Sequence, residues 1–451
     1  MVEKLYLFSF IKYVQPTWYF NLKSQADYSY WVDYNCLSEE QKTIINYDDS
    51  YVLEDSSYRD AAYQAWHKGI ISISQTESIT IVGEIPLEDE YRFIKKYYSQ
   101  FWSFFILIIR LISLKNPWLE VQSFLKSRNI QREQIYASTL YVEAKVRMSN
   151  SLIEKEPLVS VIIPTLNRYT YLKDVLKDLE SQDYKNIEVL ICDQSDPIEE
   201  GFYKGWNLNL KLYKQEEKAL WLARNKCIKE SKGDFLLFYD DDSLVESDWV
   251  SNHLRCIDYF KVPISSGVSL SKVGGVIPTN YSFFRWSDQI DTGNVMISRS
   301  VFNQTGLFDR QFEKMRMGDG EFGLRCYTLG IPNVSNPLAS RIHLKVSTGG
   351  LRHMGAWDAF RSRKFLAPLP IPSVLYFTRS YFGSKVALYS IMKTLPLSVM
   401  PYRFKQSNLM SMFGLLLFVL LLPKYIYQVV KSWRIASKML IKGPKIEVYD
   451  L

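Results

Sequence analysis

Three consecutive carboxylates are the first candidates for chemistry in this sequence. In "GDFLLFYDDDSLV", residues 233–245, an apolar run ends at Tyr239, and Asp240, Asp241 and Asp242 follow directly. Carboxylates packed this closely raise one another's pKa unless a cation compensates their charge. Mg²⁺ and Mn²⁺ take one or two protein carboxylates and fill their other positions with water and phosphate oxygens. The stretch therefore indicates a divalent metal ion that bridges the protein to a diphosphate. The alternative is that Asp242 only caps the next helix.

The segments that must position these carboxylates are typical of an α/β sheet. Four apolar runs read as strands: "LVSVIIPT", "NIEVLICD", "LNLKLYK" and "DFLLFY". Between the first two, "YTYLKDVLKDLESQ" predicts a helix with one apolar face, formed by Leu172, Val175, Leu176 and Leu179. "EKALWLARNKCIKESKG" reads as a helix that ends in a left-handed cap at Gly233. The alternation of strands and helices predicts a mostly parallel sheet, flanked by helices and joined by right-handed crossovers.

The carboxyl ends of these strands are where a ligand should bind. In an open parallel sheet, ligands sit in the crevice beyond the carboxyl ends of the strands. Asp193 ends the second strand and the Asp240–Asp242 triplet ends the fourth. We therefore expect both acidic groups to face one crevice.

The sequence divides into three regions, which we expect at residues 1–150, 151–360 and 361–451. The first is expected to be an α+β extension of unknown role. Its segment Ile70–Ile85 alternates apolar and polar residues and predicts a hairpin. Residues 98–118 form a strongly apolar block, interrupted by Arg110, which reads as a buried or interfacial helix.

The third region is expected to be helical, amphipathic, basic and aromatic. Leu409–Leu422 is a 14-residue, nearly apolar run that Pro423 stops and that five Lys or Arg residues follow before residue 443. A span needs about 20 residues, so this run is short for one. It suits a helix lying in the interface of an anionic leaflet. The alternative is a helical hairpin packed on the central region.

The net charge and the cysteine content indicate which partners and which cellular compartment to expect. The chain has 451 residues and a net charge of +7, which is no signature of a nucleic-acid-binding protein. Five scattered cysteines form no CxxC pair and fit a reducing compartment. The N-terminus lacks a small-residue cleavage site for secretion. We therefore expect a cytoplasmic protein, peripheral on the inner face of the cell membrane.

Three segments in order resemble one known family. They are "VSVIIPTLNRYTYLKDVLKDLESQDYKNIEVLICDQSD", "LARNKCIKESKGDFLLFYDDD" and "GNVMISRSVFNQTGLFDRQFEKMRMGDGEFGLRCYTLG". Together they resemble the family 2 glycosyltransferases of the GT-A fold, over about residues 157–355. The resemblance implies a Rossmann-like, mostly parallel sheet flanked by helices. It also implies an inverting sugar transfer that depends on Mn²⁺ or Mg²⁺.

The resemblance also implies roles for residues of the nucleotide-sugar site. By this likeness the nucleotide pocket is lined by Pro164, Thr165, Asn167 and Arg168. Asp193 would accept a hydrogen bond from the nucleobase, and Arg224 and Asn225 would close on the nucleotide sugar. Asp240 and Asp242 are the outer residues of a DxD motif. Asp242 would bind the metal, Asp240 would contact ribose or the metal and its water, and Asp241 would be a spectator.

The resemblance places the catalytic base in "GDGEFGLR". The family carries an acidic pair here, whereas this chain has Gly318 before Asp319. Asp319 is the expected base and Glu321 the reserve, unless both carboxylates only cap the helix that begins there. At a helix N-terminus the base should have a low pKa. His343 resembles a late histidine that serves as a further metal ligand in some members, although a lone histidine is more often structural.

These observations predict an enzyme that transfers a sugar from a nucleotide-diphosphate sugar, by default a uridine diphosphate sugar. The acceptor would be a hydroxyl of a glycan or of a lipid-linked molecule, as in the biosynthesis of a surface polysaccharide. Two alternatives stay open. One is a non-catalytic, membrane-associated binder of sugar nucleotides. The other is a nucleotidyltransferase, although "IIPTLNRY" lacks the glycine and lysine that such a loop favours.

Overall fold

The computed structural model describes residues 2–450, except for 72–82, 138–139, 272–274, 347–349, 351–358, 363, 402–403 and 405–406. The chain folds into two compact units. One unit comprises Met1–Val142 with Thr378–Leu397, and the other Glu143–Phe377 with Ser398–Leu451. Each unit is described by itself.

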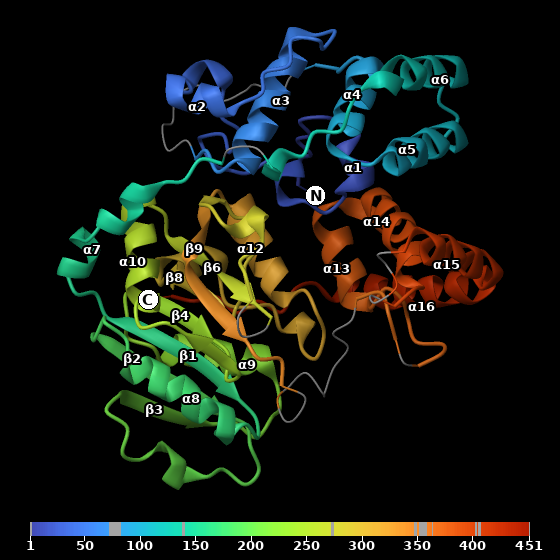
Figure 1. The fold of residues 1–451 in the computed structure, drawn as a ribbon. Coiled ribbons are helices and arrows are strands. Elements are labelled where there is room, and N and C mark those ends of the chain that lie inside the picture. The colour runs from blue at the N-terminus through green and yellow to red at the C-terminus, as the bar shows by residue number, and fades with distance from the viewer. Residues whose placement is uncertain are drawn as a thin grey trace. The chain divides into compact units, whose positions relative to one another are not determined.

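A nine-stranded sheet forms the centre of the second unit (Figure 1). Eight strands lie in the order β3-β2-β1-β4-β8-β6-β9-β5, and β7 pairs with β9. Their bounds are β1 Val159–Thr165, β2 Ile187–Asp193, β3 Asn209–Lys214, β4 Phe235–Tyr239, β5 Ser243–Val245, β6 Ile264–Leu270, β7 Arg285–Trp286, β8 Asn294–Ser298 and β9 Asn333–His343.

The four strands expected from the sequence form the parallel part of the sheet. β1 pairs in parallel with both β2 and β4, and β2 pairs in parallel with β3. All seven residues of β1 and all seven of β2 are buried, as expected for strands covered on both faces. The predicted α/β class with a mostly parallel sheet is confirmed.

Helices cover both faces of this sheet. The helices of the second unit are α7 Ser151–Glu154, α8 Tyr169–Glu180, α9 Leu220–Glu230, α10 Trp249–Phe260, α11 Ser300–Thr305, α12 Gly318–Thr328, α15 Asn408–Leu420 and α16 Leu422–Lys442, and α13 Pro372–Tyr381 begins in it. On one face, α8 and α10 pack on Val161, Val189 and Leu237. On the other, the ring of Phe238 contacts Phe302 and Phe308, and Phe322 of α12 stacks on Phe302.

The structure confirms one helix prediction in detail and corrects another. In α8 the buried residues are Leu172, Val175, Leu176 and Leu179, the predicted face. The left-handed cap expected at Gly233 is wrong, because α9 already ends at Glu230 with Ser231 as its C-cap. Glycine is needed at position 233 for a different reason. A Cβ there would lie 2.6 Å from Leu158 O and from Ser160 N, in the adjacent segment that begins β1.

An antiparallel half extends the sheet beyond β4. β8 pairs antiparallel with β4 and with β6, and β9 runs parallel to β6 and antiparallel to β5 and β7. These pairings bring residues far along the chain beside the carboxylate triplet. Asn294 pairs with Tyr239, and His343 pairs with Ser243, the residue after Asp242.

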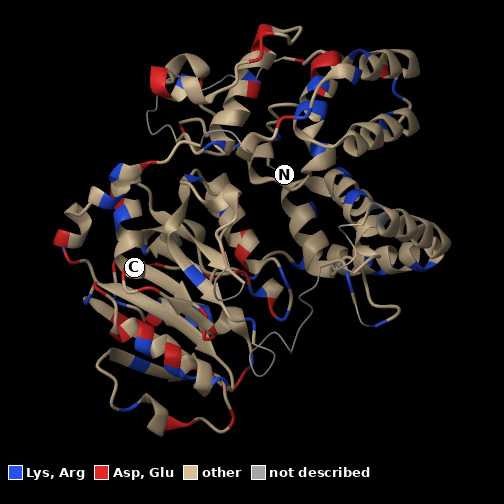
Figure 2. Cartoon of the chain, viewed as in Figure 1, with Lys and Arg blue, Asp and Glu red and all other residues tan. Residues whose placement is uncertain are grey.

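In the C-terminal region, α16 packs one face on the protein, whereas α15 is largely exposed. α16 buries Gln428, Ser432, Ala436 and Met439, and the residues after it pack on the rest of the second unit, where Glu447 O accepts a hydrogen bond from Leu307 N. α15 has no charged residue and is tan along its length in Figure 2. Among the described residues, no single helix has the length and apolar character of a membrane span. Met412–Leu420 and α16 have the length and apolar character of a span only when they are taken together, and the two helices are bent by 76° at the break between them.

The described part of the first unit is mainly helical. Its helices are α1 Ile11–Val14, α2 Glu39–Ile44, α3 Glu54–His67, α4 Leu87–Tyr97, α5 Gln100–Ile112 and α6 Pro117–Lys126, and most of α14 Gly383–Ser398 also belongs to it. Most of the hairpin predicted at 70–85 lies outside the described residues.

Candidate functional site

The loop after β1 holds the first group of site residues. Pro164 and Thr165 end β1 and line a cavity, together with Arg168 at the start of α8. Asn167 lies between them with a φ of 53°, and its backbone N–H donates to Ser195 Oγ at 2.7 Å. The left-handed backbone at Asn167 turns the chain sharply, so that Arg168 comes back over the end of the sheet.

Asp240 is held by two arginines. Arg224 Nη2 of α9 lies 3.0 Å from Asp240 Oδ1, and Arg341 Nη1 of β9 lies 2.8 Å from Asp240 Oδ2. Burial alone would raise the pKa of Asp240, but Arg341 and Arg224 outweigh it and hold the pKa well below its usual range. Gly293 makes this possible, because a Cβ there would lie 2.1 Å from Arg341 Nη1.

Asp241 is not a spectator in this arrangement. Its Oδ1 accepts a hydrogen bond from Arg168 Nη1 at 2.8 Å, and its Oδ2 accepts one from Thr165 Oγ1 at 2.8 Å. Burial raises the pKa of Asp241 to about 6, although Arg168 opposes the shift. The middle carboxylate thus ties the end of β1 and the start of α8 to the end of β4.

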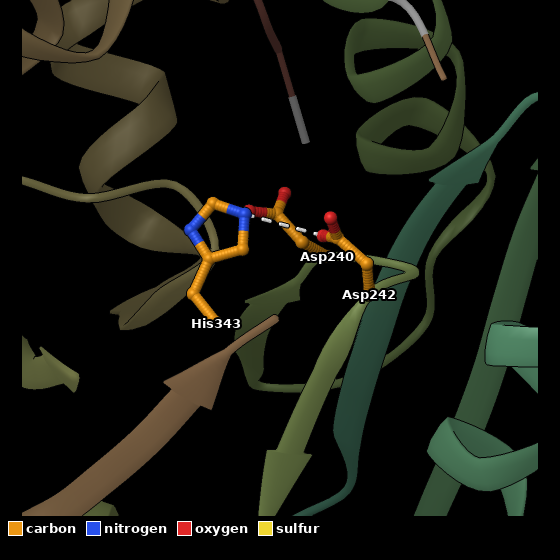
Figure 3. Close-up of side chains that lie close together, drawn as sticks. All are labelled: Asp240, Asp242 and His343. Carbon is orange, nitrogen blue, oxygen red and sulfur yellow. Dashed lines mark ion pairs between the residues drawn. The ribbon is translucent and has the colours of Figure 1, made fainter. Parts of the chain in front are cut away.

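Asp242 and His343 complete a group with Asp240 that fits a metal ion (Figure 3). His343 Nε2 lies 3.3 Å from Asp242 Oδ1, and one ligand atom from each of the three residues lies within 4.8 Å of the others. Burial acts to raise the pKa of Asp242, but the contact with His343 lowers it overall.

The donor atoms of this group suit a hard divalent cation. Asp242 Oδ2 is buried and accepts no hydrogen bond from the described residues, although Arg168 Nη1 lies 3.1 Å away. Arg168 is one cation beside this oxygen, but the same nitrogen also pairs with Asp241, so a divalent ion would add further compensation. Carboxylate oxygens suit Mg²⁺ and Mn²⁺, and neutral imidazole can join them. The residues present therefore fit the metal that the sequence predicts.

Asp319 lies in the same cavity as the carboxylate triplet. The cavity is lined by Pro164, Thr165, Leu166, Arg168, Leu220, Trp221, Arg224, Asp240, Asp241, Asp242, Asp291, Thr292, Asp319 and Gly350. Asp319 belongs to the first turn of α12, and its Oδ1 accepts a hydrogen bond from Gly320 N at 2.8 Å. Burial and the nearby Asp291 raise its pKa. The expected lowering by the helix N-terminus is therefore wrong, because desolvation outweighs it.

Trp221 explains why this chain has glycine before Asp319. A Cβ on Gly318 would lie 2.3 Å from Trp221 Cζ2, so the indole ring occupies the space that a larger residue would need. Trp221 Nε1 donates to Phe312 O at 3.1 Å, and the ring also faces the Arg224 guanidinium at 5.2 Å. The departure from the acidic pair is thus compensated by an aromatic wall.

A second cavity meets the first at two carboxylates. Its volume is about 370 Å³, and both Asp291 and Asp319 line both cavities. The other residues around it are Ser266, Gly267, Val268, Ser269, Pro278, Tyr281, Ser287, Gln289, Ile290, Ser335, Arg341 and His343. Half of them carry neutral polar side chains. Asp319 lines both cavities, so it faces each of them.

Four predicted site residues, Asn167, Asp193, Asn225 and Glu321, are not among the residues that line these cavities. Asn225 makes two hydrogen bonds of 3.0 Å with the backbone of Phe308, because successive residues on α9 face different directions. Glu321 is buried in a bidentate ion pair with Arg325, at 2.7 and 3.1 Å. Asn167 is exposed. This placement argues against Asn225 as a sugar contact and against Glu321 as the reserve base.

Asp193 is at the expected edge of the sheet but is already engaged. It pairs with Thr165 across β1 and β2. Its carboxylate is buried and accepts hydrogen bonds from Tyr169 OH and Tyr203 OH, both at 2.7 Å, and from Ser195 N at 2.8 Å. A nucleobase would thus meet a carboxylate that three protein donors already orient.

The sequence did not single out two charged residues that complete the site. Arg341 Nη2 lies 2.9 Å from Asp291 Oδ2, while Nη1 of the same guanidinium binds Asp240. Arg341 lies in β9, and Asp291 lies in the loop before β8. The only signal was an unexplained Arg in the apolar "LASRIHLKV" and an Asp just before "GNVMIS".

Comparisons with known proteins find similarity to glycosyltransferases. The family model described as glycosyl transferase family 2 matches residues 160–306. EpsH of Bacillus subtilis (strain 168) is 35% identical over 104 residues, which are 22% of this chain and 30% of that protein. The dolichyl N-acetyl-α-D-glucosaminyl phosphate 3-β-D-2,3-diacetamido-2,3-dideoxy-β-D-glucuronosyltransferase of Methanococcus voltae is 32% identical over 127 residues, 26% of this chain and 39% of the relative. The chain thus spans about a third of the length of these two relatives.

A solved structure is similar only at a low level. The structure of S. aureus TarS 1-349 in complex with UDP-GlcNAc is 15% identical, covers 65% of this chain and 97% of its own, and has a TM-score of 0.37. A likeness of this size carries no argument. The matched segment itself holds β1, the loop to Arg168, Arg224 and the Asp240–Asp242 triplet. Over residues 160–306, the chain is therefore similar to glycosyl transferase family 2.

Proposed function

We propose that this chain is a metal-dependent, inverting glycosyltransferase that uses a nucleotide-diphosphate sugar, by default a uridine diphosphate sugar. One observation carries the proposal. A group that fits a metal, Asp240 with Asp242 and His343, adjoins a cavity that also exposes the separate carboxylate of Asp319. Sugar transfer needs both parts: a site for a diphosphate and a base for the acceptor hydroxyl.

The diphosphate end of the donor would lie at the carboxylate triplet. Asp242 and His343 would hold Mn²⁺ or Mg²⁺, with Asp240 beside them. The bound ion would neutralise the negative charge that develops on the departing diphosphate. Arg168, at the end of the loop after β1, lines the same cavity and would add positive charge near the phosphates. Pro164 and Thr165 would bound the nucleoside, with Asp193 orienting the base through its ordered carboxylate.

Asp319 would act as the general base. It takes the proton from an acceptor hydroxyl, whose oxygen forms a bond to the anomeric carbon. The bond from that carbon to the diphosphate oxygen breaks, and the electron pair leaves with the nucleoside diphosphate. Attack from the face opposite the leaving group inverts the configuration. The raised pKa of Asp319 makes it a stronger base than an exposed aspartate.

The acceptor would enter through the second cavity. Its volume of about 370 Å³ lies in the range of about 300–1,000 Å³ that is typical of small-molecule pockets. Its serine, glutamine and tyrosine side chains suit the hydroxyl groups of a sugar. We infer a glycan or lipid-linked saccharide acceptor, as in the biosynthesis of a surface polysaccharide.

The proposed location is the cytoplasmic face of the cell membrane. α15 exposes Phe413, Leu416 and Leu420, and α16, which follows it, contains Arg434 and several lysines. An apolar helix followed by basic residues suits a peripheral contact with an anionic leaflet. The described cysteines are free, and four of the five are buried, which fits a reducing compartment.

A panel of nucleotide sugars incubated without acceptor tests this function. The full chain with Mn²⁺ should release the sugar slowly as free hydrolysed sugar, and EDTA or Asp242→Asn should stop the release. Release of pyrophosphate instead would indicate a nucleotidyltransferase. Tight binding of a nucleotide sugar with no turnover on any saccharide acceptor would indicate a binder without catalysis.

A further inference from the structure

Helices α5 and α6 of the first unit form a helical hairpin whose outer surface is apolar. Only residues 113–116 separate Gln100–Ile112 from Pro117–Lys126, and Figure 1 shows the two helices side by side. The connection is the most exposed apolar point of the hairpin, with Leu114 at 93% exposure. We use the name hairpin tip for Ile112, Leu114, Lys115, Trp118 and Leu119.

Helix α6 buries polar residues and exposes apolar ones. Its buried residues are the polar Glu120 and Ser123. Glu120 accepts hydrogen bonds from Arg110 Nε at 2.7 Å and from Tyr91 OH at 2.8 Å. The apolar Trp118, at 75% exposure, faces outward together with Leu119, Val121 and Leu125. A surface helix in water shows the opposite pattern.

Helix α5 is apolar on both of its faces. Ile106 and Ile109 are buried against the unit, while Phe104, Ile108 and Ile112 are exposed on the other side. A helix that is apolar all round lies in a core or in lipid. In the described first unit the outer sides of α5 and α6 both expose large apolar side chains.

Some exposed charges beside this surface are positive and others are paired. Lys126 is exposed and forms an ion pair with Glu88, Arg110 is paired with the buried Glu120, and Lys95 and Lys96 are buried. Lys115, Arg128 and Arg132 are exposed. Such a surface complements an anionic leaflet, where each nearby cation adds to the attraction.

We propose that the hairpin tip and the outer faces of α5 and α6 dock into the surface of an anionic lipid bilayer. The 13 residues of α5 span about 20 Å, short of the ~30 Å hydrocarbon core, so the hairpin enters one leaflet. This surface lies in the first unit, apart from α15, and it does not depend on the proposed transfer reaction.

The tip favours lipid over a protein partner because of Lys115. This lysine is exposed directly beside Leu114, the most exposed apolar residue of the hairpin. A protein partner that covered Leu114 would also bury the ammonium group and would need a carboxylate for it. At a bilayer the lysine reaches the phosphate headgroups while its stem and Leu114 lie among the acyl chains.

Co-sedimentation of the full chain with vesicles tests this inference. The vesicles are phosphatidylcholine alone or with phosphatidylglycerol. The double variant Leu114→Glu/Trp118→Glu should lower the partition coefficient on anionic vesicles by about ten-fold or more. Val52→Glu, on an exposed apolar residue of the same unit outside the hairpin, should leave it unchanged. Lys115→Ala should weaken binding only to the anionic vesicles.

A second background separates this surface from α15. The same comparison is made with Phe413→Glu, so that α15 no longer holds the protein on the vesicle. Equal sedimentation of the double variant and the parent in both backgrounds would overturn the inference. So would a loss of melting temperature or a change in oligomeric state in the double variant without a change in vesicle binding, because the surface would then be covered by protein.

Discussion

At the scale of residues, three neighbouring aspartates have three different environments. Asp240 is neutralised by Arg224 and Arg341, Asp241 is bound by Arg168 and Thr165, and Asp242 faces His343. Arg168 Nη1 also lies 3.1 Å from Asp242 Oδ2, so one guanidinium serves both Asp241 and Asp242. Like charges are tolerated side by side here because arginines and His343 surround them, and a divalent cation would add to this compensation.

Asp319→Asn should remove turnover and leave nucleotide binding intact. The amide cannot take a proton, so kcat should fall by about 10²–10⁴-fold. The dissociation constant for uridine diphosphate with Mn²⁺, measured by calorimetry, should stay close to that of the parent. Glu321→Gln is the matched control on the same helix. It should destabilise the fold by breaking the buried pair with Arg325, but kcat per folded molecule should be retained.

Asp241→Asn should weaken nucleotide binding although Asp241 is not a proposed metal ligand. The change removes the charge that holds Arg168 over the cavity. We expect the dissociation constant of uridine diphosphate to rise by about ten-fold, a loss of one charge-assisted hydrogen bond. Calorimetry with and without Mn²⁺ checks this. A dissociation constant equal to that of the parent would return Asp241 to the spectator role.

Gly318→Ala should destabilise the protein because of Trp221. The new methyl group would lie 2.3 Å from the indole ring, which Phe312 O and the packing around it hold in place. Overpacking of this kind costs about 1–3 kcal/mol, measured as the free energy of unfolding in urea. Gly201→Ala is the control, because a Cβ there meets nothing within 4 Å. Equal stability of the two variants would contradict the role given to Trp221.

At the scale of elements, the antiparallel strands decide which side chains reach the site. The pairing of β5 with β9 places His343 opposite Ser243, and Leu344 N donates to Asp242 O at 2.9 Å. A shift of one residue in this register would turn His343 to the other face of the sheet. Asn294, the first residue of β8, is held by a buried polar network. There, Trp249 Nε1 and His253 Nε2 lie 2.8 and 3.1 Å from Asn294 Oδ1.

His253 should make the stability of the protein fall in mild acid. Burial lowers its pKa from 6.5 to about 4, so below pH 6.5 the unfolded chain binds a proton that the folded chain does not. This contribution is complete above pH 6.5 and is lost as the pH falls toward 4. From pH 7 to 5 it amounts to about 2 kcal/mol.

Urea unfolding of the parent and of His253→Gln at pH 7 and pH 5 checks this prediction. The glutamine amide can still reach Ser265 or Asn294 but does not titrate. The variant should therefore lose about 2 kcal/mol less than the parent between the two pH values. The same pH dependence in both proteins would mean that His253 is not the group responsible.

At the scale of the whole molecule, each unit carries its own exposed apolar surface. In the second unit it is α15, and in the first it is the outer side of α5 and α6. In the C-terminal region, α16 has a buried face and the residues after it contact the rest of the second unit, whereas α15 exposes Phe413, Leu416 and Leu420.

Phe413→Glu/Leu416→Glu should therefore lower vesicle binding without changing catalysis on a soluble acceptor. Two buried apolar side chains are worth about 1.5–3 kcal/mol each, so the partition coefficient should fall by more than about ten-fold. Co-sedimentation with phosphatidylcholine–phosphatidylglycerol vesicles measures it. Val276→Glu, also on an exposed residue of the second unit, is the control. Unchanged sedimentation would remove α15 from the membrane contact.

The sequence alone determined the parallel half of the sheet and the clustering of Asp240–Asp242 at its edge. Strand runs and helical faces such as that of α8 are local patterns, and the edge follows from parallel topology. Only the tertiary structure decided which residues meet there. Arg341, Asp291 and His343 arrive by antiparallel pairings across long stretches of chain, and Asn225 and Glu321 turn away because neighbouring helical residues face different directions. Such pairings depend on long-range packing, which no local pattern of residue types records.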